Sequence, residues 1–161
     1  MIIQIMGLPG SGKTELAKAL KEKINAIHLN ADEVRATINS DLSFTSDDRI
    51  EHARRMGETA RLIAKQGVAP VIVDFICPTD LTRAAFGKPD IMVFMDTLAE
   101  GRFEDTNKMF ERPTNFDVSF IDKNTGINHY RTNISNGCWT KCNIEYFVEW
   151  KVNIYEDGKL W

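Results

Sequence analysis

Near its amino terminus the chain carries glycines in the spacing G-x-x-x-x-G-K-[ST], directly after an apolar run at residues 2–6. The pattern consists of Gly7, Leu8, Pro9, Gly10, Ser11, Gly12, Lys13 and Thr14. Glycines so spaced let consecutive backbone N–H groups turn toward one anion, and the amino end of a following helix strengthens that field. We therefore predict a phosphate-binding loop, in which Lys13 meets the β- and γ-phosphates of ATP and the Thr14 hydroxyl binds Mg²⁺. An ordinary glycine turn is the alternative, and both flanking segments argue against it.

Charged residues of both signs follow the second apolar segment, residues 26–29. A kinase needs a carboxylate that deprotonates the accepting hydroxyl and a cation that holds an anionic acceptor. Asp32 and Arg35 stand just after a strand end, which is the binding edge of a parallel sheet, so we interpret them as base and acceptor contact. The alternative is that Asp32 only caps a helix and Arg35 is solvated. No Asn-Lys-x-Asp segment of the kind a GTPase needs is present.

A second carboxylate, Asp74, ends the apolar run at residues 71–73. An acid at the end of a buried strand beside a phosphate loop fits a role toward Mg²⁺ or its water shell. The alternative is a strand-end aspartate that accepts backbone N–H bonds. The cofactor we expect is Mg²⁺, bound together with ATP as co-substrate.

Strand-like and helix-like segments alternate over the first hundred residues, which predicts an α/β fold with a parallel sheet and helices on both faces. Strands are predicted at residues 2–6, 26–29, 70–75 and 90–96. Helices are predicted from residue 15, at 32–38, at 45–65, from Pro78 and Thr79, and as a short acidic helix after residue 96. Ser46 is the expected cap of the long helix and Gly67 its expected end. Helical periodicity fades after Glu104.

The last third of the chain has a different pattern, because apolar and polar residues alternate with period two at residues 144–155. Turns are expected at residues 124–126 and 157–158. We therefore expect one domain, residues 1–161, with a kinase core at 1–115 and a β-rich C-terminal segment at 116–161. The aromatic side chains of this segment complete the core or form an interface, which leaves a homodimer open.

The net charge and the apolar segments of the chain limit the kinds of partner that we expect. The 161 residues carry a net charge of −3, so no basic surplus exists to hold a nucleic-acid backbone, and small nucleotides are the expected partners. No apolar stretch approaches the roughly 20 residues of a membrane span, and the N-terminal apolar run is too short for a signal peptide. We expect no membrane partner and a cytoplasmic location.

Several motifs follow the loop in a fixed order, at residues 29–35, 41–44, 48–51 and 54–58. Together they resemble the adenylylsulfate kinase family, over about the first hundred residues and again at residues 110–113. The resemblance implies a P-loop NTPase fold. It also implies transfer of the ATP γ-phosphate to the 3′-hydroxyl of adenosine 5′-phosphosulfate, a step of sulfate assimilation.

The resemblance also implies roles for individual residues. Asp32 and Lys13 would be catalytic, and acceptor binding would fall to Arg35, Phe44, Arg49, His52, Phe75, Ile76 and Cys77. The two arginines would hold the phosphosulfate and the two phenylalanines would sandwich the adenine. Plain core packing is the alternative for the phenylalanines, and an exposed helix position is the alternative for His52, which stands where the family usually has asparagine. Cys77 replaces a usual serine.

Two departures from the family bear on the acceptor. The family's long basic lid is reduced to residues 105–109, where Lys108 is the candidate to replace one charge. An Asp-Gly-Asp sequence becomes Asn30-Ala31-Asp32, which keeps one carboxylate. Two alternatives therefore remain open: a P-loop kinase for another hydroxyl, such as a nucleoside, a polynucleotide 5′-end or a modified base, and a non-catalytic ATP-binding regulatory module. Arg54 and Arg55 receive no chemical role, because charge on a long helix usually marks a solvated face.

Overall fold

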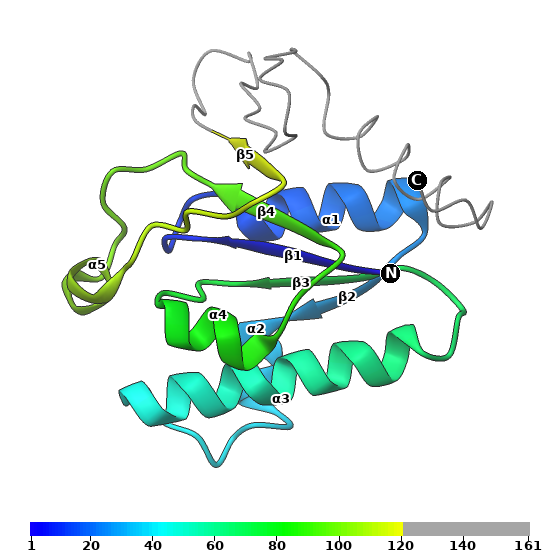
Figure 1. Ribbon diagram of the computed structural model, residues 1–161, viewed down its shortest axis with the longest axis horizontal. Coiled ribbons are helices and arrows are strands. Elements are labelled where there is room, and N and C mark those ends of the chain that lie inside the picture. The colour runs from blue at the N-terminus through cyan, green and yellow to red at the C-terminus, as the bar shows by residue number, and fades with distance from the viewer. Residues whose placement is uncertain (121–161) are drawn as a thin grey trace.

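The computed structural model describes residues 1–120, and within them five strands form one parallel sheet in the order β2-β3-β1-β4-β5 (Figure 1). The strands are β1 (Ile2–Gly7), β2 (Ile27–Asn30), β3 (Val71–Phe75), β4 (Ile91–Met95) and β5 (Val118–Phe120). Each neighbouring pair runs parallel. The predicted parallel α/β sheet is therefore confirmed, and the carboxyl ends of its strands meet at one edge.

The described helices cover both faces of this sheet. They are α1 (Lys13–Ile24), α2 (Ala31–Ala36), α3 (Ser46–Ala64), α4 (Asp80–Phe86) and α5 (Glu104–Met109). In Figure 1, α1 lies on one face, while α3 and α4 lie side by side on the other. Parallel strands require such crossover helices, because each connection must return the chain to the same end of the sheet.

The central strand β1 shows how the sequence produces this layering. All six of its residues are buried, since consecutive side chains point to opposite faces and both faces are covered. Ile3 and Ile5 join the core cluster that includes Leu20 of α1. Ile2 and Met6 join the cluster that includes α3. A continuous apolar run is thus the expected signature of a strand in the middle of a two-faced core.

Most helix ends lie within about three residues of their predicted positions, and two differences have a clear physical cause. Thr45, not Ser46, caps α3, and its side chain accepts a hydrogen bond from the Asp48 N–H. The prediction that helical structure fades after Glu104 is wrong, because α5 begins at that residue. A side-chain amide explains the difference: Asn107 accepts from the Gly101 N–H at 2.8 Å and donates to the Gly101 carbonyl at 3.0 Å, which fixes the turn before the helix.

The predicted strand at residues 144–155 and the two predicted turns beyond residue 120 lie outside the described residues. Of the predicted C-terminal β-rich segment, the described residues include one strand, β5. Across residues 1–120, the search for a helix with the length and apolar character of a membrane span found none.

Candidate active site

A cleft of about 910 Å³ opens at the carboxyl ends of β1, β2 and β3. It contains Lys13 and Thr14 from the phosphate loop (residues 7–14), together with Asp32 and Asp74. All the predicted acceptor-binding residues line the same cleft, namely Arg35, Phe44, Arg49, His52, Phe75, Ile76 and Cys77. The fold thus brings together residues that are up to 64 positions apart in the chain, from Lys13 to Cys77.

Glycine is required in the phosphate loop for two physical reasons. Gly7, Gly10 and Gly12 have φ angles of +147°, +86° and +94°, which side chains disfavour. A Cβ atom on Gly7 would also lie only 2.6 Å from the Met95 carbonyl oxygen. The loop then leads directly into α1, with Gly12 at its N-cap position, so the amino end of the helix faces the cleft.

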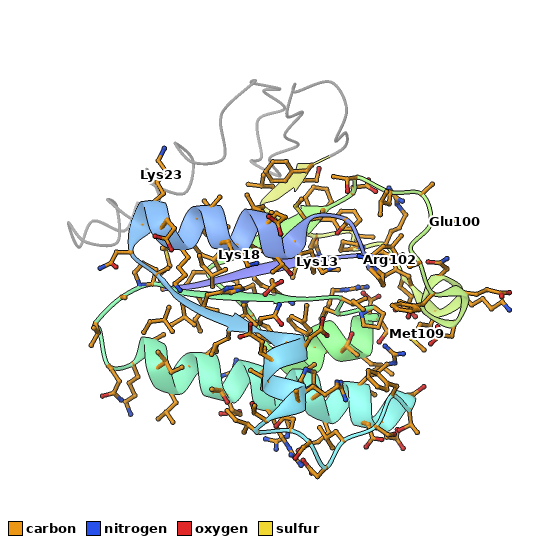
Figure 2. The ribbon with its side chains drawn as sticks, turned by 180° about the vertical axis from the view of Figure 1, so that it is seen from behind. Lys13, Lys18, Lys23, Glu100, Arg102 and Met109 are labelled. Atoms are coloured by element: carbon orange, nitrogen blue, oxygen red, sulfur yellow. The ribbon has the colours of Figure 1, made fainter. Side chains whose placement is uncertain are left out.

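Lys13 is held over this loop. Its Nζ donates a hydrogen bond to the Leu8 carbonyl at 2.8 Å, and the residue is only 9% exposed. Figure 2 shows Lys13 at the end of α1 nearer Arg102, with Lys23 at the other end of the helix. The charged Lys13 side chain therefore forms part of the cleft wall.

Asp74 is the centre of a buried hydrogen-bond network and is 2% exposed. Thr14 Oγ1 donates to Asp74 Oδ2 at 2.7 Å, and His28 Nε2 lies 2.6 Å from Asp74 Oδ1. The Asn30 amide donates to both carboxylate oxygens, at 3.1 and 3.2 Å. Burial alone would raise the pKa of Asp74, but the hydrogen bonds from His28 and Thr14 lower this pKa below its usual range. The carboxyl group is therefore ionised.

This oxygen-rich arrangement fits Mg²⁺. The ion prefers oxygen ligands, keeps several waters, and is usually held by one or two protein groups plus substrate phosphates. The Thr14 hydroxyl and the Asp74 carboxylate supply such groups beside the phosphate loop. In residues 1–120, no cluster of three or more His, Cys, Asp or Glu side chains is placed to hold a metal without such a substrate.

Asp32 lies in the first turn of α2, where it is exposed and lines the cleft. The cap of this helix is Asn30, whose Oδ1 accepts hydrogen bonds from the N–H groups of Asp32 and Glu33 at 3.0 and 3.1 Å. The alternative that the Asp32 side chain serves as the helix cap is therefore wrong. Its carboxylate is available on the cleft surface.

Phe44 lies on the segment that leads from α2 to α3 and is 66% exposed. The Arg35 guanidinium lies 4.8 Å from the centre of its ring, and that of Arg49 lies 5.6 Å away. Arg35 also donates to the Ser43 carbonyl at 2.5 Å, and Arg49 donates to the Phe44 carbonyl at 2.9 Å. Burial and the neighbouring Arg49 lower the pKa of Arg35. An aromatic face and two cations thus share one wall of the cleft.

Phe75 and Cys77 form the floor of the cleft. Phe75 is mostly buried and packs on Phe86, with 5.3 Å between ring centres, so core packing accounts for most of its surface. Cys77 is buried with a φ of +48°, and its carbonyl accepts a hydrogen bond from Arg83 at 3.2 Å. Burial raises the pKa of the Cys77 thiol to about 12, so the thiol is neutral.

His52 is buried, at 4% exposure, and the alternative of an exposed helix histidine is wrong. The Asn39 amide nitrogen lies 2.9 Å from His52 Nδ1, an arrangement in which Nδ1 accepts and Nε2 carries the proton. Burial, with the charges of Arg35 and Arg55, lowers the pKa of His52 to about 4, against a weaker opposing effect of the Ala31 backbone. Among residues 1–120, neither His52 Nε2 nor Asn39 Oδ1 has a hydrogen-bond partner of good geometry.

The shortened lid places Arg102, rather than Lys108, in the cleft. A Cβ atom on Gly10 would lie 3.2 Å from Arg102 Nε, so the guanidinium packs on the phosphate loop. Lys108 instead pairs with Glu104 at 2.7 Å on the exposed side of α5. Asp105 reaches across the cleft to Arg49, at 3.3 Å. The interpretation that Lys108 replaces a lid charge is therefore wrong.

Two contributors to the site are not identified from the sequence. His28 is predicted only as part of a strand, although a polar residue in an apolar strand is a signal. Asn30 is interpreted as a lost carboxylate, although asparagine before a helix is a strong N-cap and its amide also reaches Asp74. From sequence, Arg102 is a candidate for adenine or phosphate contact, and its position on the phosphate loop depends on the turn that Asn107 fixes.

Comparison with known proteins gives a consistent picture. A family model described as adenylylsulphate kinase matches residues 1–115. The chloroplastic adenylyl-sulfate kinase of Catharanthus roseus is 44% identical over 104 residues, which cover 59% of this chain and 33% of that protein. The adenylyl-sulfate kinase of Clostridium acetobutylicum is 36% identical over 103 residues, which cover 59% of this chain and 52% of that protein. The chain thus matches about a third to a half of the length of these relatives.

Solved structures show the same fold. The Mycobacterium tuberculosis APS kinase CysC in complex with AMPPNP and APS aligns with a TM-score of 0.63 and 22% identity, over 96% of each chain. The hexameric APS kinase from Thiobacillus denitrificans aligns with a TM-score of 0.59 and 20% identity, over 99% of this chain and 29% of that one. At these identities, the similarity demonstrates the P-loop architecture.

Proposed function

The chain belongs to the adenylylsulfate kinase family, and on that premise we propose that it is an ATP-dependent kinase that phosphorylates the 3′-hydroxyl of adenosine 5′-phosphosulfate. The observation that carries the proposal is the shared cleft, which joins the phosphate loop to Asp32 and to the arginine-flanked Phe44. The cleft can bind the donor phosphates next to a candidate base. Its aromatic and cationic wall suits an anionic nucleotide as the acceptor. Such a reaction would serve sulfate assimilation.

In this proposal the phosphate loop and Lys13 hold the transferred phosphoryl group and balance its developing charge. Asp32 accepts the proton of the attacking hydroxyl. Its exposure on the cleft surface supports this role. Bound Mg²⁺ would neutralise phosphate charge during transfer, and Thr14 with Asp74 would hold it.

On the acceptor side, Arg35 and Arg49 hold the phosphosulfate, and Phe44 stacks on the adenine. Phe75 would contact the adenine only through the small part of its side chain that core packing leaves exposed. His52, neutral at physiological pH, offers Nε2–H as a buried donor to the acceptor. Ile76 and Cys77 complete the apolar floor. Self-association as a homodimer is a further proposal, which sedimentation of the full chain tests.

A second candidate is a P-loop kinase for another hydroxyl, and the short lid favours it. A long basic lid would exclude water and add cations during transfer. Here α5 has only six residues, and Asp105 places a negative charge beside Arg49. A smaller or less anionic acceptor would tolerate that arrangement better.

Transfer of label from γ-labelled ATP tests these proposals. The full chain is incubated with Mg²⁺ and adenylylsulfate, and in parallel with adenosine and a 5′-hydroxyl oligonucleotide. We expect label in 3′-phosphoadenylylsulfate. Label only in another acceptor would replace the proposed substrate and leave the family as ancestry. ATP binding with no transfer to any acceptor would support a regulatory module instead.

A further inference from the structure

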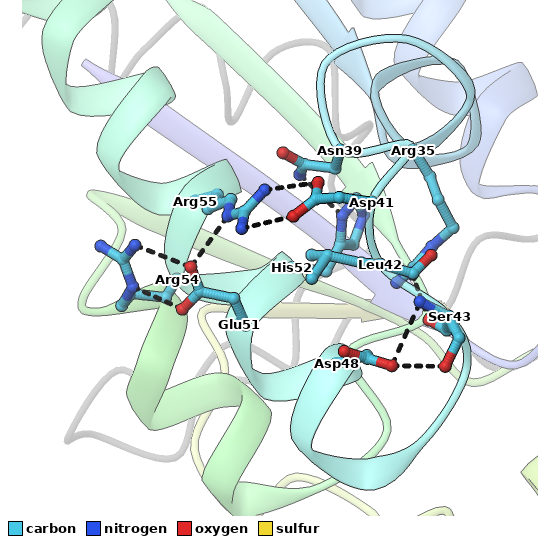
Figure 3. Close-up of polar contacts among 10 residues, drawn as sticks. All are labelled: Arg35, Asn39, Asp41, Leu42, Ser43, Asp48, Glu51, His52, Arg54 and Arg55. Atoms are coloured by element: carbon cyan, nitrogen blue, oxygen red, sulfur yellow. Dashed lines mark hydrogen bonds and ion pairs between the residues drawn. The ribbon is translucent and has the colours of Figure 1, made fainter.

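The segment at residues 37–45, called here the acceptor loop, has no helix or strand structure of its own (Figure 3). It carries Phe44, which lines the cleft. Backbone hydrogen bonds hold the first part of this loop, where the Asn39 N–H donates to the Val34 carbonyl at 2.9 Å and the Leu42 N–H donates to the Asn39 carbonyl at 3.1 Å.

Side-chain contacts supply further restraints on the acceptor loop. Two of these contacts come from Arg35 and Arg49, which line the cleft itself. Asp48 of α3 adds hydrogen bonds to Ser43, at its N–H and its hydroxyl.

A further contact lies outside the cleft. Arg55 of α3 donates from Nη1 and Nη2 to the two carboxylate oxygens of Asp41, at 2.7 and 2.8 Å. The Nε of Arg55 donates to Glu51 at 2.8 Å, so a second carboxylate fixes the orientation of the guanidinium. A bidentate pair of this kind sets both distance and direction, which a single point charge does not.

We propose that Arg55 is a positioning residue for the acceptor, because with Glu51 it holds Asp41 and thereby the acceptor loop. Asp41 is three residues before Phe44, so a shift of this contact moves the aromatic wall of the cleft. The proposal rests on the proposed function for the identity of the acceptor. The proposal gives Arg55 a role, whereas the helix pattern alone assigns Arg55 to a solvated face.

Partly exposed ion pairs contribute little to global stability, so the effect of Arg55 should appear in binding geometry rather than in folding. Loss of the pair should leave the sheet and the phosphate loop in place, since the hydrogen bonds of Arg55 go to Asp41 and Glu51. The proposal therefore predicts a separation of effects: weaker use of the acceptor with unchanged ATP binding.

The chain supplies a matched control. Arg54 is the neighbouring residue on α3 and binds the same carboxylate, Glu51, at 2.7 and 2.8 Å. Figure 3 shows its guanidinium on the far side of Glu51 from Asp41 and the acceptor loop. Arg54→Gln thus removes an equal charge and an equal ion pair without releasing the loop.

The experiment measures hydrogen exchange of residues 38–45 and steady-state kinetics in the full chain and its Arg55→Gln, Arg55→Lys and Arg54→Gln variants. For Arg55→Gln we expect faster exchange in the acceptor loop and a KM for adenylylsulfate raised about fivefold, with kcat and ATP affinity unchanged. Arg55→Lys should lie between Arg55→Gln and the wild type, because lysine keeps the charge but not the bidentate geometry. Arg54→Gln should match the wild type.

Equal loop exchange in Arg55→Gln and wild type would overturn the proposal. So would equal effects of Arg55→Gln and Arg54→Gln, which would show a general charge effect. The exchange measurement needs no acceptor. If the wild-type chain does not phosphorylate adenylylsulfate, the proposed function fails, while loop exchange still decides whether Arg55 holds the loop.

Discussion

The two halves of the cleft are built differently. The phosphate half consists of the β1–α1 loop and Asp74, which are fixed by the central strands of the sheet and by a buried hydrogen-bond network. The acceptor half consists of α2, the acceptor loop and the cleft face of α3, which are held by ion pairs and contacts to loop carbonyls. The difference indicates that the fold determines phosphate binding, whereas side-chain contacts determine what is phosphorylated.

Both halves contain buried polar atoms without hydrogen-bond partners among the described residues. Both oxygens of Asp74 accept hydrogen bonds although the residue is 2% exposed. Ser11 Oγ in the phosphate loop, and His52 Nε2 and Asn39 Oδ1 in the acceptor half, are buried without such partners. Buried polar atoms normally find partners, so these three atoms are candidates for contact with the polar atoms of a ligand. The following variants test the contrast, from the largest expected effect to the smallest.

Asp32→Asn should slow phosphoryl transfer without weakening ATP binding. Loss of a general base costs about 10²- to 10⁴-fold in kcat, while the phosphate half remains intact and ATP affinity stays unchanged. Steady-state kinetics and calorimetric ATP binding measure the two quantities. Glu33→Gln is the control, since Glu33 is the next exposed carboxylate on α2 and does not line the cleft. Full activity of Asp32→Asn would remove the proposed base.

Asp74→Asn should weaken Mg²⁺ binding in the phosphate half and leave the acceptor half unchanged. The carboxylate orients Thr14, and groups that orient a metal ligand typically contribute 10- to 100-fold in metal affinity. We expect a 10- to 100-fold higher Mg²⁺ requirement for tight ADP binding, measured by calorimetry with and without Mg²⁺. Asp96→Asn is the control, because Asp96 follows β4 and pairs with Arg112 away from the cleft. An unchanged Mg²⁺ dependence would show that Asp74 is only structural.

His52 should make the acceptor half sensitive to acid. Its pKa is about 4 in the folded chain, against 6.5 for an ordinary histidine. Between these values the unfolded chain binds more protons, so stability is present above pH 6.5 and is lost as the pH falls toward 4. The loss is about 2 kcal/mol from pH 7 to pH 5, and denaturant unfolding of the wild type and His52→Asn should reveal it as a difference. Parallel pH profiles of the two proteins would contradict the assignment.

Asp105→Asn should improve acceptor use slightly. Asp105 pairs with Arg49, so it competes with an anionic acceptor for this guanidinium. Exposed ion pairs are weak, and we expect KM for adenylylsulfate to fall about two- to fivefold with kcat unchanged. Glu104→Gln is the control, since Glu104 pairs with Lys108 outside the cleft. A higher KM for Asp105→Asn would show that this carboxylate assists the acceptor.

The sequence predicted the phosphate loop with its strand and helix because their determinants are local, but it did not predict the contacts of His28 and Asn30 with Asp74. The glycine spacing, the preceding apolar strand and the following helix are adjacent in the chain, and the structure keeps all three together. The parallel sheet followed from the alternation of apolar strands and helices. The sequence predicted separate roles of Thr14 and Asp74 toward Mg²⁺, and their direct hydrogen bond was not predicted.

The acceptor half was less predictable because its determinants are long-range. The motifs identified Phe44 and Arg49 but not the contact between Asp41 and Arg55 that fixes their loop, because it joins residues 14 positions apart through a geometry that no local pattern encodes. The burial of His52 depends on Asn39, which belongs to the same irregular segment. In the phosphate half, the position of Arg102 is likewise long-range, because it depends on a turn held by the Asn107 side chain.

Hydrogen exchange of the wild-type chain with each ligand tests the division of the cleft most directly. ADP with Mg²⁺ should slow exchange at residues 8–16. Further addition of adenylylsulfate should slow exchange at residues 39–52 without a further change in the phosphate loop. Protection of the phosphate loop alone by adenylylsulfate, or no response at residues 39–52, would contradict the account.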